Sequence, residues 1–339
     1  MPALIREATL MVRAIDLFCG GGGSSWGAQA AGAELVGAVD AWDVAARTYS
    51  DNFPGAVVVN TRLSDESGPE IFGDIGQVDL LIASPECTHH SIARGARPRC
   101  DESRRSGWYV MRFIREMRPQ WIVLENVAMM RNWEGFRELK TALEDVGYLL
   151  TIQTLDAADF GVPQARRRLF IMGERGPKPD EVTVTPSNPL PASTILDEPG
   201  TWPAKHAFDE RRAEATAERI RAGIAELGEG EDFLVVYYSS DRAGGWQPLT
   251  RPLRTLTTLD RFGLVSWVEG IPRLRMLQVP ELRRAMGFGP CPRTGREYRL
   301  ECGSRRDRVK ILGNGVCPPV MQHIVEHLTD IGRSLARAA

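Results

Sequence analysis

The chain has 339 residues, with 42 Lys and Arg against 44 Asp and Glu, a formal net charge of −2 and 43% hydrophobic residues. This composition is typical of a globular protein with one large core and a smaller lobe. It has no apolar run long enough to span a membrane and its first ten residues carry charge, so we expect neither insertion nor export, and a cytoplasmic location. Its six cysteines form no C-x-x-C pair, which disfavours a zinc ribbon and a disulfide framework.

Between residues 11 and 173, short apolar runs alternate with amphipathic stretches. We expect strands at 12–18, 34–40, 56–60, 78–84, 120–126, 148–155 and 167–173, and helices at 24–31, 43–52, 102–117 and 133–146. This alternation predicts right-handed βαβ units in an α/β fold with a doubly wound, mostly parallel sheet. The last two runs have no helix between them, so we expect a hairpin-like edge.

The character of the sequence changes after Gly173, where a stretch rich in Pro and polar residues is typical of a linker. A charged helix is predicted within 209–231, and strands are predicted at 233–240 and 262–269. We therefore expect a first domain at residues 1–176, a small second domain at 177–301 and a C-terminal segment at 302–339 that returns to the first domain.

The charge is unevenly spread along the chain. Residues 271–310 contain eleven basic and four acidic side chains, a local net charge of +7 that leaves −9 for the rest. A basic surface on an acidic body is typical of a face that follows a phosphate backbone. The alternative is that these arginines only cover the surface of a small lobe.

Four glycines at 20–23 follow the first strand and precede a helix that Ser24 or Ser25 could cap. The G-x-G-x-x-G fingerprint fails, which disfavours a nicotinamide dehydrogenase, and no Gly-Lys-Ser/Thr follows, which excludes a P-loop. Asp40 ends the second strand, where a carboxylate can accept both ribose hydroxyls. Each feature alone could be structural. Together they predict an adenosine ligand without a pyrophosphate.

Six side chains able to carry chemistry lie near later strands: the first three at carboxyl ends, the edge where ligands bind in this fold class, and the last three at positions that enter a strand. They are Cys87, Glu125, Asn126, Gln164, Arg166 and Arg168. A lone Cys is more often a buried hydrophobe, but polar neighbours on both sides of Cys87 indicate a loop. The last three alternate on entering their strand, which predicts that they point to one side.

These motifs, in this order, resemble those of the cytosine-C5 methyltransferases that use S-adenosylmethionine. The resemblance covers roughly 11–173 and 249–325, and it implies a Rossmann-like methyltransferase fold with a smaller recognition domain. The motifs that carry it are DLFCGGGG, Asp40 with Thr48, Tyr49 and Asn52, SPECTHHS, ENV, QARRR, RPLRTLTT, RMLQVPELRRAMGF and GNGVCPPV.

The resemblance implies four catalytic residues. Cys87 would add as a thiolate to cytosine C6, and Glu125 would bind the amino group and N3 through a carboxyl whose pKa burial raises. Arg168 would hold the base's O2 and orient Glu125, while Arg166 would support the loop or a phosphate. Because a stacked base is unreachable, the resemblance also implies that the target cytosine is flipped into the pocket.

The resemblance also implies cofactor and substrate contacts, with Phe18 against the adenine, Asp40 on the ribose and Asn60 near the adenine amino group. The implied cofactor residues are Asp16, Phe18, Gly20, Gly22, Gly23, Asp40, Trp42, Asn60, Glu86 and Asn314. The implied substrate residues are Ser91, Arg94, Arg97, Asn126 and Gln164. Arg94 and Arg97 belong to an arginine-rich loop that we expect to close over the extruded nucleotide.

The sequence departs from the family around the proposed nucleophile. Glu86 replaces the usual Pro, Thr88 the usual Gln and His90 the usual aromatic residue. A carboxylate beside Cys87 should raise the pKa of the thiol by like-charge repulsion unless a nearby cation neutralises it. An altered base or donor is therefore an alternative to the family reaction. Asn60 replaces the usual Asp at the adenine.

The resemblance implies a DNA (cytosine-5-)-methyltransferase, from a restriction-modification system, an orphan gene or a phage, that acts as a monomer on double-stranded DNA. An RNA methyltransferase of the same fold is an alternative, but the stretch at 174–248 suits a small lobe that reads duplex sequence. A non-enzymatic nucleic-acid binder is a third hypothesis, which Glu86 favours and the intact Cys87, Glu125 and Arg168 disfavour.

One pattern points to a metal. His323, Glu326 and His327 spell H-x-x-E-H, as in some zinc proteases. No third ligand is visible, and these residues follow a motif with its own role. We therefore expect no metal.

Overall fold

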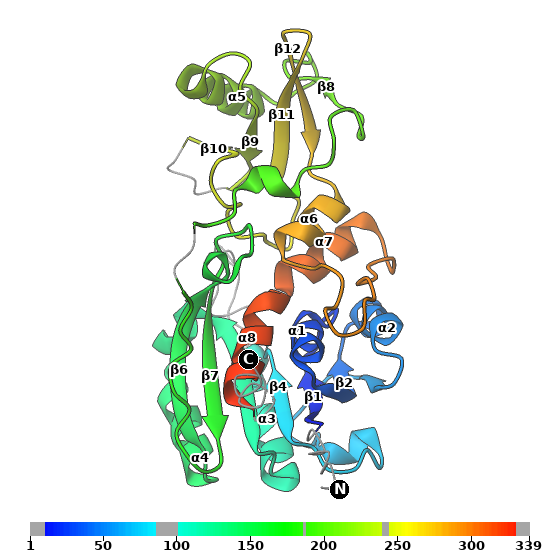
Figure 1. Cartoon of the computed structure of the whole chain (residues 1–339), viewed down its shortest axis with the longest axis vertical. Coiled ribbons are helices and arrows are strands. Elements are labelled where there is room, and N and C mark those ends of the chain that lie inside the picture. The colour runs from blue at the N-terminus through cyan, green and yellow to red at the C-terminus, as the bar shows by residue number, and fades with distance from the viewer. Residues whose placement is uncertain (1–10, 86–100, 186–187, 239–243, 330–339) are drawn as a thin grey trace, which may run out of the picture.

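The computed structural model describes residues 11–85, 101–185, 188–238 and 244–329 (Figure 1). Its larger body is a seven-stranded sheet in the order β3-β2-β1-β4-β5-β7-β6. The strands are β1 (Arg13–Leu17), β2 (Glu34–Asp40), β3 (Val57–Asn60), β4 (Leu80–Ala83), β5 (Trp121–Val127), β6 (Leu149–Asp156) and β7 (Arg167–Glu174). Its helices are α1 (Gly23–Ala31), α2 (Asp43–Asn52), α3 (Asp101–Met117) and α4 (Phe136–Asp145).

Sheet topology confirms the α/β prediction. The pairs from β3 to β5 are parallel, whereas β7 runs antiparallel between β5 and β6. The β6–β7 hairpin therefore forms the expected edge. Strands β1 and β4 are almost wholly buried, as expected for parallel strands covered on both faces. The strand order reverses between β1 and β4, and α/β folds bind ligands at such a switch point.

Helix α1 begins differently from the expectation. The prediction that Ser24 or Ser25 caps it was wrong, because the N-cap is Gly22 in the left-handed region with no side-chain cap. A glycine adopts φ of +88° without the steric cost that a Cβ brings. Ser25 lies inside the helix and directs its hydroxyl to Asp16 at 2.7 Å instead.

The last part of the chain packs against the body. Helix α7 (Arg305–Asn314) leads into α8 (Pro318–Leu328), which lies beside α1 (Figure 1). This contact is close because Gly27 has no side chain, and a Cβ there would lie 2.3 Å from Pro318 O. No helix in the described part of the chain is long and apolar enough to cross a membrane.

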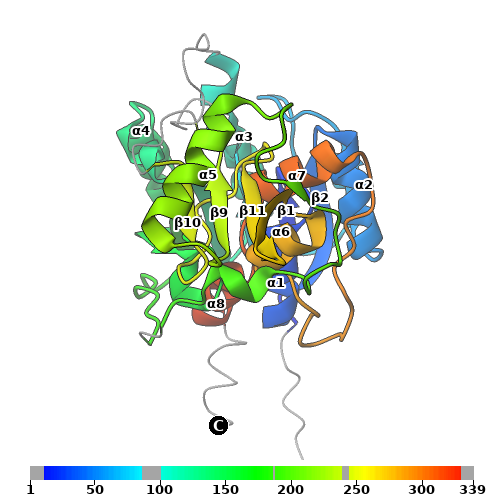
Figure 2. The same cartoon turned by 90° about the horizontal axis from the view of Figure 1, so that it is seen from above.

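A second, smaller sheet forms the upper lobe (Figures 1 and 2). It is antiparallel in the order β10-β9-β11-β12-β8. Its strands are β8 (Lys205–His206), β9 (Phe233–Val236), β10 (Trp246–Pro248), β11 (Phe262–Val268) and β12 (Ile271–Met276), and α5 (Glu214–Leu227) packs on β9 and β10. The lobe has a small apolar core of its own, which includes Ile220, Phe233 and Val265.

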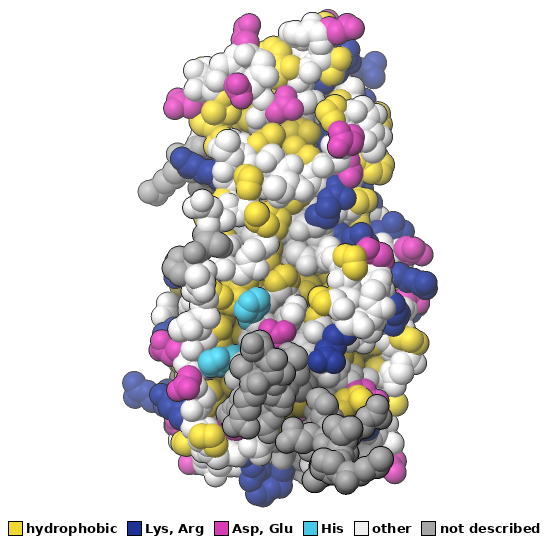
Figure 3. Space-filling model, in the orientation of Figure 1, with side chains coloured by type: hydrophobic (Ala, Val, Ile, Leu, Met, Phe, Trp, Pro, Cys, Tyr) yellow, Lys and Arg dark blue, Asp and Glu magenta, His cyan; other side chains and the backbone are white. Residues whose placement is uncertain are grey.

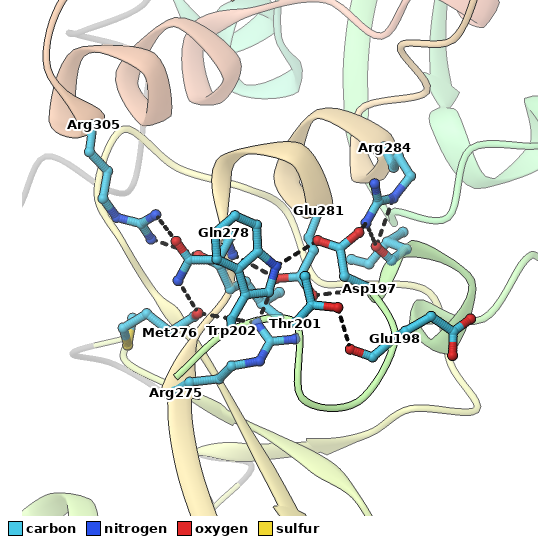
Figure 4. Close-up of polar contacts among 12 residues, drawn as sticks. Asp197, Glu198, Thr201, Trp202, Arg275, Met276, Gln278, Glu281, Arg284 and Arg305 are labelled. Carbon is cyan, nitrogen blue, oxygen red and sulfur yellow. Dashed lines mark hydrogen bonds and ion pairs between the residues drawn. The ribbon is translucent and has the colours of Figure 1, made fainter. Parts of the chain in front are cut away.

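The lobe joins the body through a polar neck, which we define as residues 195–202 and 275–284 (Figure 4). Glu281, in α6 (Val279–Ala285), is fully buried and binds the Arg275 guanidinium through both oxygens, at 2.6 and 2.7 Å. It also accepts the backbone N–H of Asp197 at 3.1 Å. Asp197 in turn pairs with Arg284 at 2.5 Å and accepts Trp202 Nε1 at 2.7 Å. One carboxylate thus joins the chain segments that enter and leave the lobe.

The neck contains three of the eleven basic side chains of residues 271–310, the window in which we expected a basic surface. Four of the eleven basic side chains in residues 271–310 form ion pairs: Arg275 with Glu281, Arg283 with Glu297, Arg284 with Asp197, and Arg305 with Asp260. On the face seen in Figure 3, basic and acidic side chains are interspersed rather than gathered into one basic surface. Ion pairs within the protein therefore engage these four side chains, a use that neither the basic-surface expectation nor its alternative described.

Candidate active site

The predicted cofactor residues gather at the carboxyl ends of the parallel strands. Asp16 lies in β1, Asp40 ends β2 and Asn60 ends β3. Asp40 Oδ2 accepts Gly20 N at 2.8 Å and its Oδ1 accepts Trp42 N at 2.8 Å. The Asn60 amide donates to Asp40 O at 2.9 Å. These contacts tie the glycine loop to the ends of two strands.

Within the glycine loop, the residues face different surroundings. Gly20 has φ of +52°, and a Cβ built on it would meet nothing within 4 Å. A Cβ on Gly21 would lie 2.5 Å from Ile311 Cγ2, and one on Gly23 would lie 2.4 Å from Val316 O. The loop therefore packs its later glycines against the C-terminal segment and leaves the Gly20 side open for a ligand.

Asp16 is fully buried beside this loop. Its Oδ2 accepts the Ser25 hydroxyl at 2.7 Å, and because Ser25 has a single hydroxyl hydrogen, Tyr49 Oη donates to Ser25 at 2.8 Å. Among the described residues, Asp16 Oδ1 has no hydrogen-bond partner. Burial raises the pKa of Asp16 to about 7, and the nearby Asp40 and Glu125 carboxylates act in the same direction.

Three further cofactor candidates surround the loop. Phe18 has φ of +58°, which is uncommon for a residue with a side chain and occurs preferentially at functional sites. The Trp42 ring carries Lys310 Nζ at 4.0 Å from its centroid, a cation–π contact. Asn314 is the exposed last residue of α7.

A buried ion pair lies two strands from the loop. Glu125 Oε1 in β5 lies 3.2 Å from Arg168 Nε in β7, and both side chains are largely shielded from solvent. Burial raises the pKa of Glu125, while the Arg168 and Arg166 guanidinium groups and the Ser84 hydroxyl oppose that rise. A carboxyl whose pKa is raised by burial holds its proton more readily than an exposed one and is suited to donate a proton or a hydrogen bond.

Arg166 is 2% exposed and lies between three loops. Its Nη1 donates to Leu256 O at 2.8 Å, and its Nη2 donates to Gly313 O and Gly315 O, each at 2.8 Å. The two glycines flank Asn314, so Arg166 fixes the backbone on both sides of that residue. This position fits support of a loop better than contact with a phosphate.

Two predicted substrate residues also use their amides inside the protein. Gln164 is fully buried; its Nε2 donates to Ala285 O at 2.9 Å and its Oε1 accepts Leu256 N at 2.8 Å. Asn126 Nδ2 donates to Pro85 O at 3.1 Å. Asn126 thereby holds the last described residue before the predicted nucleophile segment.

That segment itself lies outside the described residues. It contains Glu86, Cys87, Ser91, Arg94 and Arg97, so the roles expected for them stay predictions.

The H-x-x-E-H residues have other partners. The His323 ring nitrogen contacts Pro319 O at 2.9 Å, and His327 Nε2 contacts Asp180 O at 3.0 Å. No group of three or more potential metal ligands occurs within the described residues.

Three residues around the loop were not predicted. Ser25 donates to Asp16 and Tyr49 donates to Ser25, as described, and Tyr298 Oη donates to Gly21 O at 2.6 Å. Tyr49 stood within the second resemblance motif, which hinted at a role. No local signal marks Tyr298, because it lies 277 residues from its partner.

Together, the sheet order, the glycine loop and the strand-end carboxylates define a Rossmann-like α/β protein. The model of the C-5 cytosine-specific DNA methylase family matches residues 12–330, and the chain belongs to this family.

Individual relatives agree with this assignment. The chain is 33% identical over 207 residues to the type II methyltransferase M.XorII of Xanthomonas oryzae, with 58% of this chain and 47% of M.XorII covered. It is 34% identical over 171 residues to M.AgeI of Thalassovita gelatinovora, with 48% and 39% covered. The chain thus spans about half the length of the curated relatives it matches. Its fold is similar to that of Spodoptera frugiperda DNMT2, with a TM-score of 0.68, 19% identity and coverage of 94% and 99%.

Proposed function

We propose that this chain transfers a methyl group from S-adenosylmethionine to C5 of cytosine in double-stranded DNA. The buried Glu125–Arg168 pair carries this proposal. The next residue, Asn126, binds Pro85 O, so the chain two residues before Cys87 lies beside this pair. Membership of the C-5 cytosine-specific DNA methylase family supports it. We place the protein, as a monomer without a metal, in the cytoplasm of a bacterium or an infected host cell.

The residues around the glycine loop fit S-adenosylmethionine, which when bound supplies an electrophilic methyl group. Asp16 Oδ1 is buried without a partner among the described residues, and a cationic amino group would satisfy it. The Asp40 oxygens accept backbone N–H groups, and a carboxylate at this strand end can also accept ribose hydroxyls. The open side of Gly20 allows a ligand to approach the backbone. Phe18, Trp42, Asn60 and Asn314 complete the set that we assign to the cofactor.

The chain's own residues would activate the base. The Cys87 thiolate forms a bond to cytosine C6, which moves electron density toward C5 and N3. Glu125 donates its proton or a hydrogen bond at N3, which its raised pKa favours. In this proposal Arg168 binds O2, and its ion pair with Glu125 supports the role of holding that carboxyl in position. Once C5 carries the methyl group, a base removes the C5 proton, and the C6–sulfur bond breaks to restore the aromatic ring and regenerate the thiolate.

Duplex DNA is the preferred substrate in this proposal, and RNA is the second candidate. The upper lobe, with its own sheet and core, is of a size to read a short duplex sequence. In such a complex the cytosine would leave the helix and enter the active site. We assign Ser91, Arg94, Arg97, Asn126 and Gln164 to the surroundings of the extruded nucleotide.

Transfer of labelled methyl groups tests this function. Purified protein is incubated with methyl-labelled S-adenosylmethionine and either mixed-sequence duplex DNA or transfer RNA. We expect label in duplex DNA, and none with Cys87→Ser. Label in transfer RNA alone would establish the RNA alternative. No label in any nucleic acid, with nucleic-acid binding indifferent to Cys87→Ser, would contradict an enzymatic role.

A further inference from the structure

Residues 288–300 pack against the glycine loop and the two helices beside it, although the sequence pattern predicted that they belong to the small domain. This stretch, the orange loop between α6 and α7, runs beside α1 and α2 (Figure 1). Asn52 in α2 fixes it at one end: Asn52 Nδ2 donates to Arg299 O and Asn52 Oδ1 accepts Arg299 N, both at 2.8 Å. Trp26 in α1 fixes the other end, where Nε1 donates to Gly289 O at 3.2 Å. The stretch is thus attached to both helices that flank the loop.

Tyr298 projects from this stretch into the core and is 1% exposed. Its ring stacks on Phe288 with centroids 4.1 Å apart and meets Trp26 edge-on at 5.4 Å. Arg283 Nη1 donates to Tyr298 O at 2.7 Å. Ring and backbone are both fixed, so the hydroxyl is held in one place before any ligand binds.

That hydroxyl acts on the middle of the glycine loop. Tyr298 Oη donates to Gly21 O at 2.6 Å. A Cβ built on Gly21 would lie only 2.7 Å from Tyr298 Oη. On the other side of Gly21, Asp40 Oδ2 accepts Gly20 N at 2.8 Å. Gly20 and Gly22 have φ of +52° and +88°. Because glycine has no Cβ, the backbone at these two residues could adopt many other conformations without such contacts. Alongside the backbone bond from Gly22 N to Cys19 O at 2.9 Å, these two side-chain bonds help to hold the loop in a single conformation.

We propose that Tyr298 is a positioning residue for the cofactor loop, and that residues 288–300 serve the S-adenosylmethionine site rather than DNA recognition. The inference rests on the proposed function, because it takes S-adenosylmethionine as the loop's ligand. Without the Tyr298 hydroxyl, the loop populates more conformations, and the binding-competent fraction falls. The structure of the upper lobe and the affinity of the protein for DNA are unaffected.

Isothermal titration calorimetry of the full chain with S-adenosylmethionine and with S-adenosylhomocysteine tests this proposal. Tyr298→Phe removes only the hydroxyl. Tyr148→Phe is its matched control, because Tyr148 is equally buried and donates its hydroxyl to Pro119 O away from the loop. For Tyr298→Phe we expect Kd for both ligands to rise about fivefold, the loss of one ordinary hydrogen bond, and KM for S-adenosylmethionine to rise with kcat little changed. For Tyr148→Phe we expect unchanged Kd, and for both variants an unchanged affinity for duplex DNA by fluorescence anisotropy.

The possible outcomes are distinct. Equal Kd values for wild type and Tyr298→Phe would overturn the positioning role while the proposed function stands. Affinity losses that follow the fall in Tm equally in both tyrosine variants would also overturn it, because the role would then be general stability. A wild type that binds neither ligand would overturn the proposed function together with this inference.

Discussion

Asp16 shows how a single buried carboxylate links the stability of the fold to pH. Its ordinary pKa of 3.8 is raised to about 7 in the folded chain, mainly by burial. Between these values the folded protein keeps a proton that the unfolded chain has released. The free energy of unfolding therefore falls as pH rises from about 4 to about 7, and this contribution is constant above that range.

Asp16→Asn should remove this dependence, because an amide keeps an acceptor for Ser25 and carries no charge. Without cofactor, we expect the variant to gain about 2–3 kcal/mol in unfolding free energy relative to wild type between pH 5 and pH 8. Urea unfolding at the two pH values measures this difference. Parallel stabilities of the two proteins across the range would show that Asp16 is already ionised at pH 5.

Glu125 is the residue on which the proposed chemistry most depends. Burial raises its pKa, and Arg168 and Arg166 are the cations of the described residues that oppose the rise. We expect Glu125→Gln to lower the methyl-transfer rate by about 100-fold or more, because the amide cannot give a proton to N3. Affinity for S-adenosylmethionine should be unchanged. Glu144→Gln, at an exposed carboxylate paired with Lys140, is the control. A Glu125→Gln variant with more than a tenth of wild-type activity would rule out proton donation by Glu125.

Sequence patterns located some site residues and missed others for a physical reason. Asp40 and Glu125 lie at ends of buried strands, which hydrophobic runs reveal directly. The partners of Arg166 and Tyr298 lie between 90 and 277 residues away along the chain. Such contacts depend on how the C-terminal segment folds back, which periodicity does not encode. The resemblance to the family indicated Arg166 but not Tyr298.

At the level of elements, alternation of apolar and amphipathic runs was sufficient to predict the large sheet and its antiparallel edge. The start of α1 was not predicted correctly, because the serines after the glycines suited a cap by composition. The chain instead turns at Gly22 with a left-handed conformation, which frees Ser25 to bind the buried Asp16. A tertiary contact thus overrode a local preference.

The packing of α1 on α8 gives a prediction for Gly27. Alanine favours an isolated helix by about 1 kcal/mol over glycine, but a Cβ at residue 27 would lie 2.3 Å from Pro318 O. We expect Gly27→Ala to lower the unfolding free energy by about 1–3 kcal/mol, as overpacked contacts do. Gly55→Ala is the control, since a Cβ there meets nothing within 4 Å. Urea unfolding of both variants measures the effect, and a stabilised Gly27→Ala variant would mean that α8 shifts easily away from α1.

Across the whole molecule, the net charge of −2 conceals a local excess of positive charge, part of which is used in ion pairs within the protein. The sequence predicted a basic surface at 271–310, but ion pairs in and near the neck engage four of these side chains. Charge counted along a chain cannot separate a paired arginine from an exposed one. Arginines of this window, among them Arg275 and Arg284, help to form the neck between lobe and body (Figure 4).

The neck should therefore be sensitive to loss of its central carboxylate. Glu281→Gln leaves the nearly buried Arg275 guanidinium without its counter-charge, and we expect a loss of about 3–5 kcal/mol in unfolding free energy. Glu214→Gln, in an exposed pair with Arg221 on α5, should change it by less than about 1 kcal/mol. Chemical denaturation of both variants measures this contrast. Equal, small effects would show that the neck is held by packing alone.

The central claim, methylation of cytosine C5 in DNA, is tested most directly by bisulfite sequencing of DNA from cells that express the protein. We predict cytosines protected from conversion at a recurring sequence context in cells with the wild-type chain. The Cys87→Ser variant should leave those cytosines convertible. Complete conversion in both, from cells that contain folded protein, would contradict the claim.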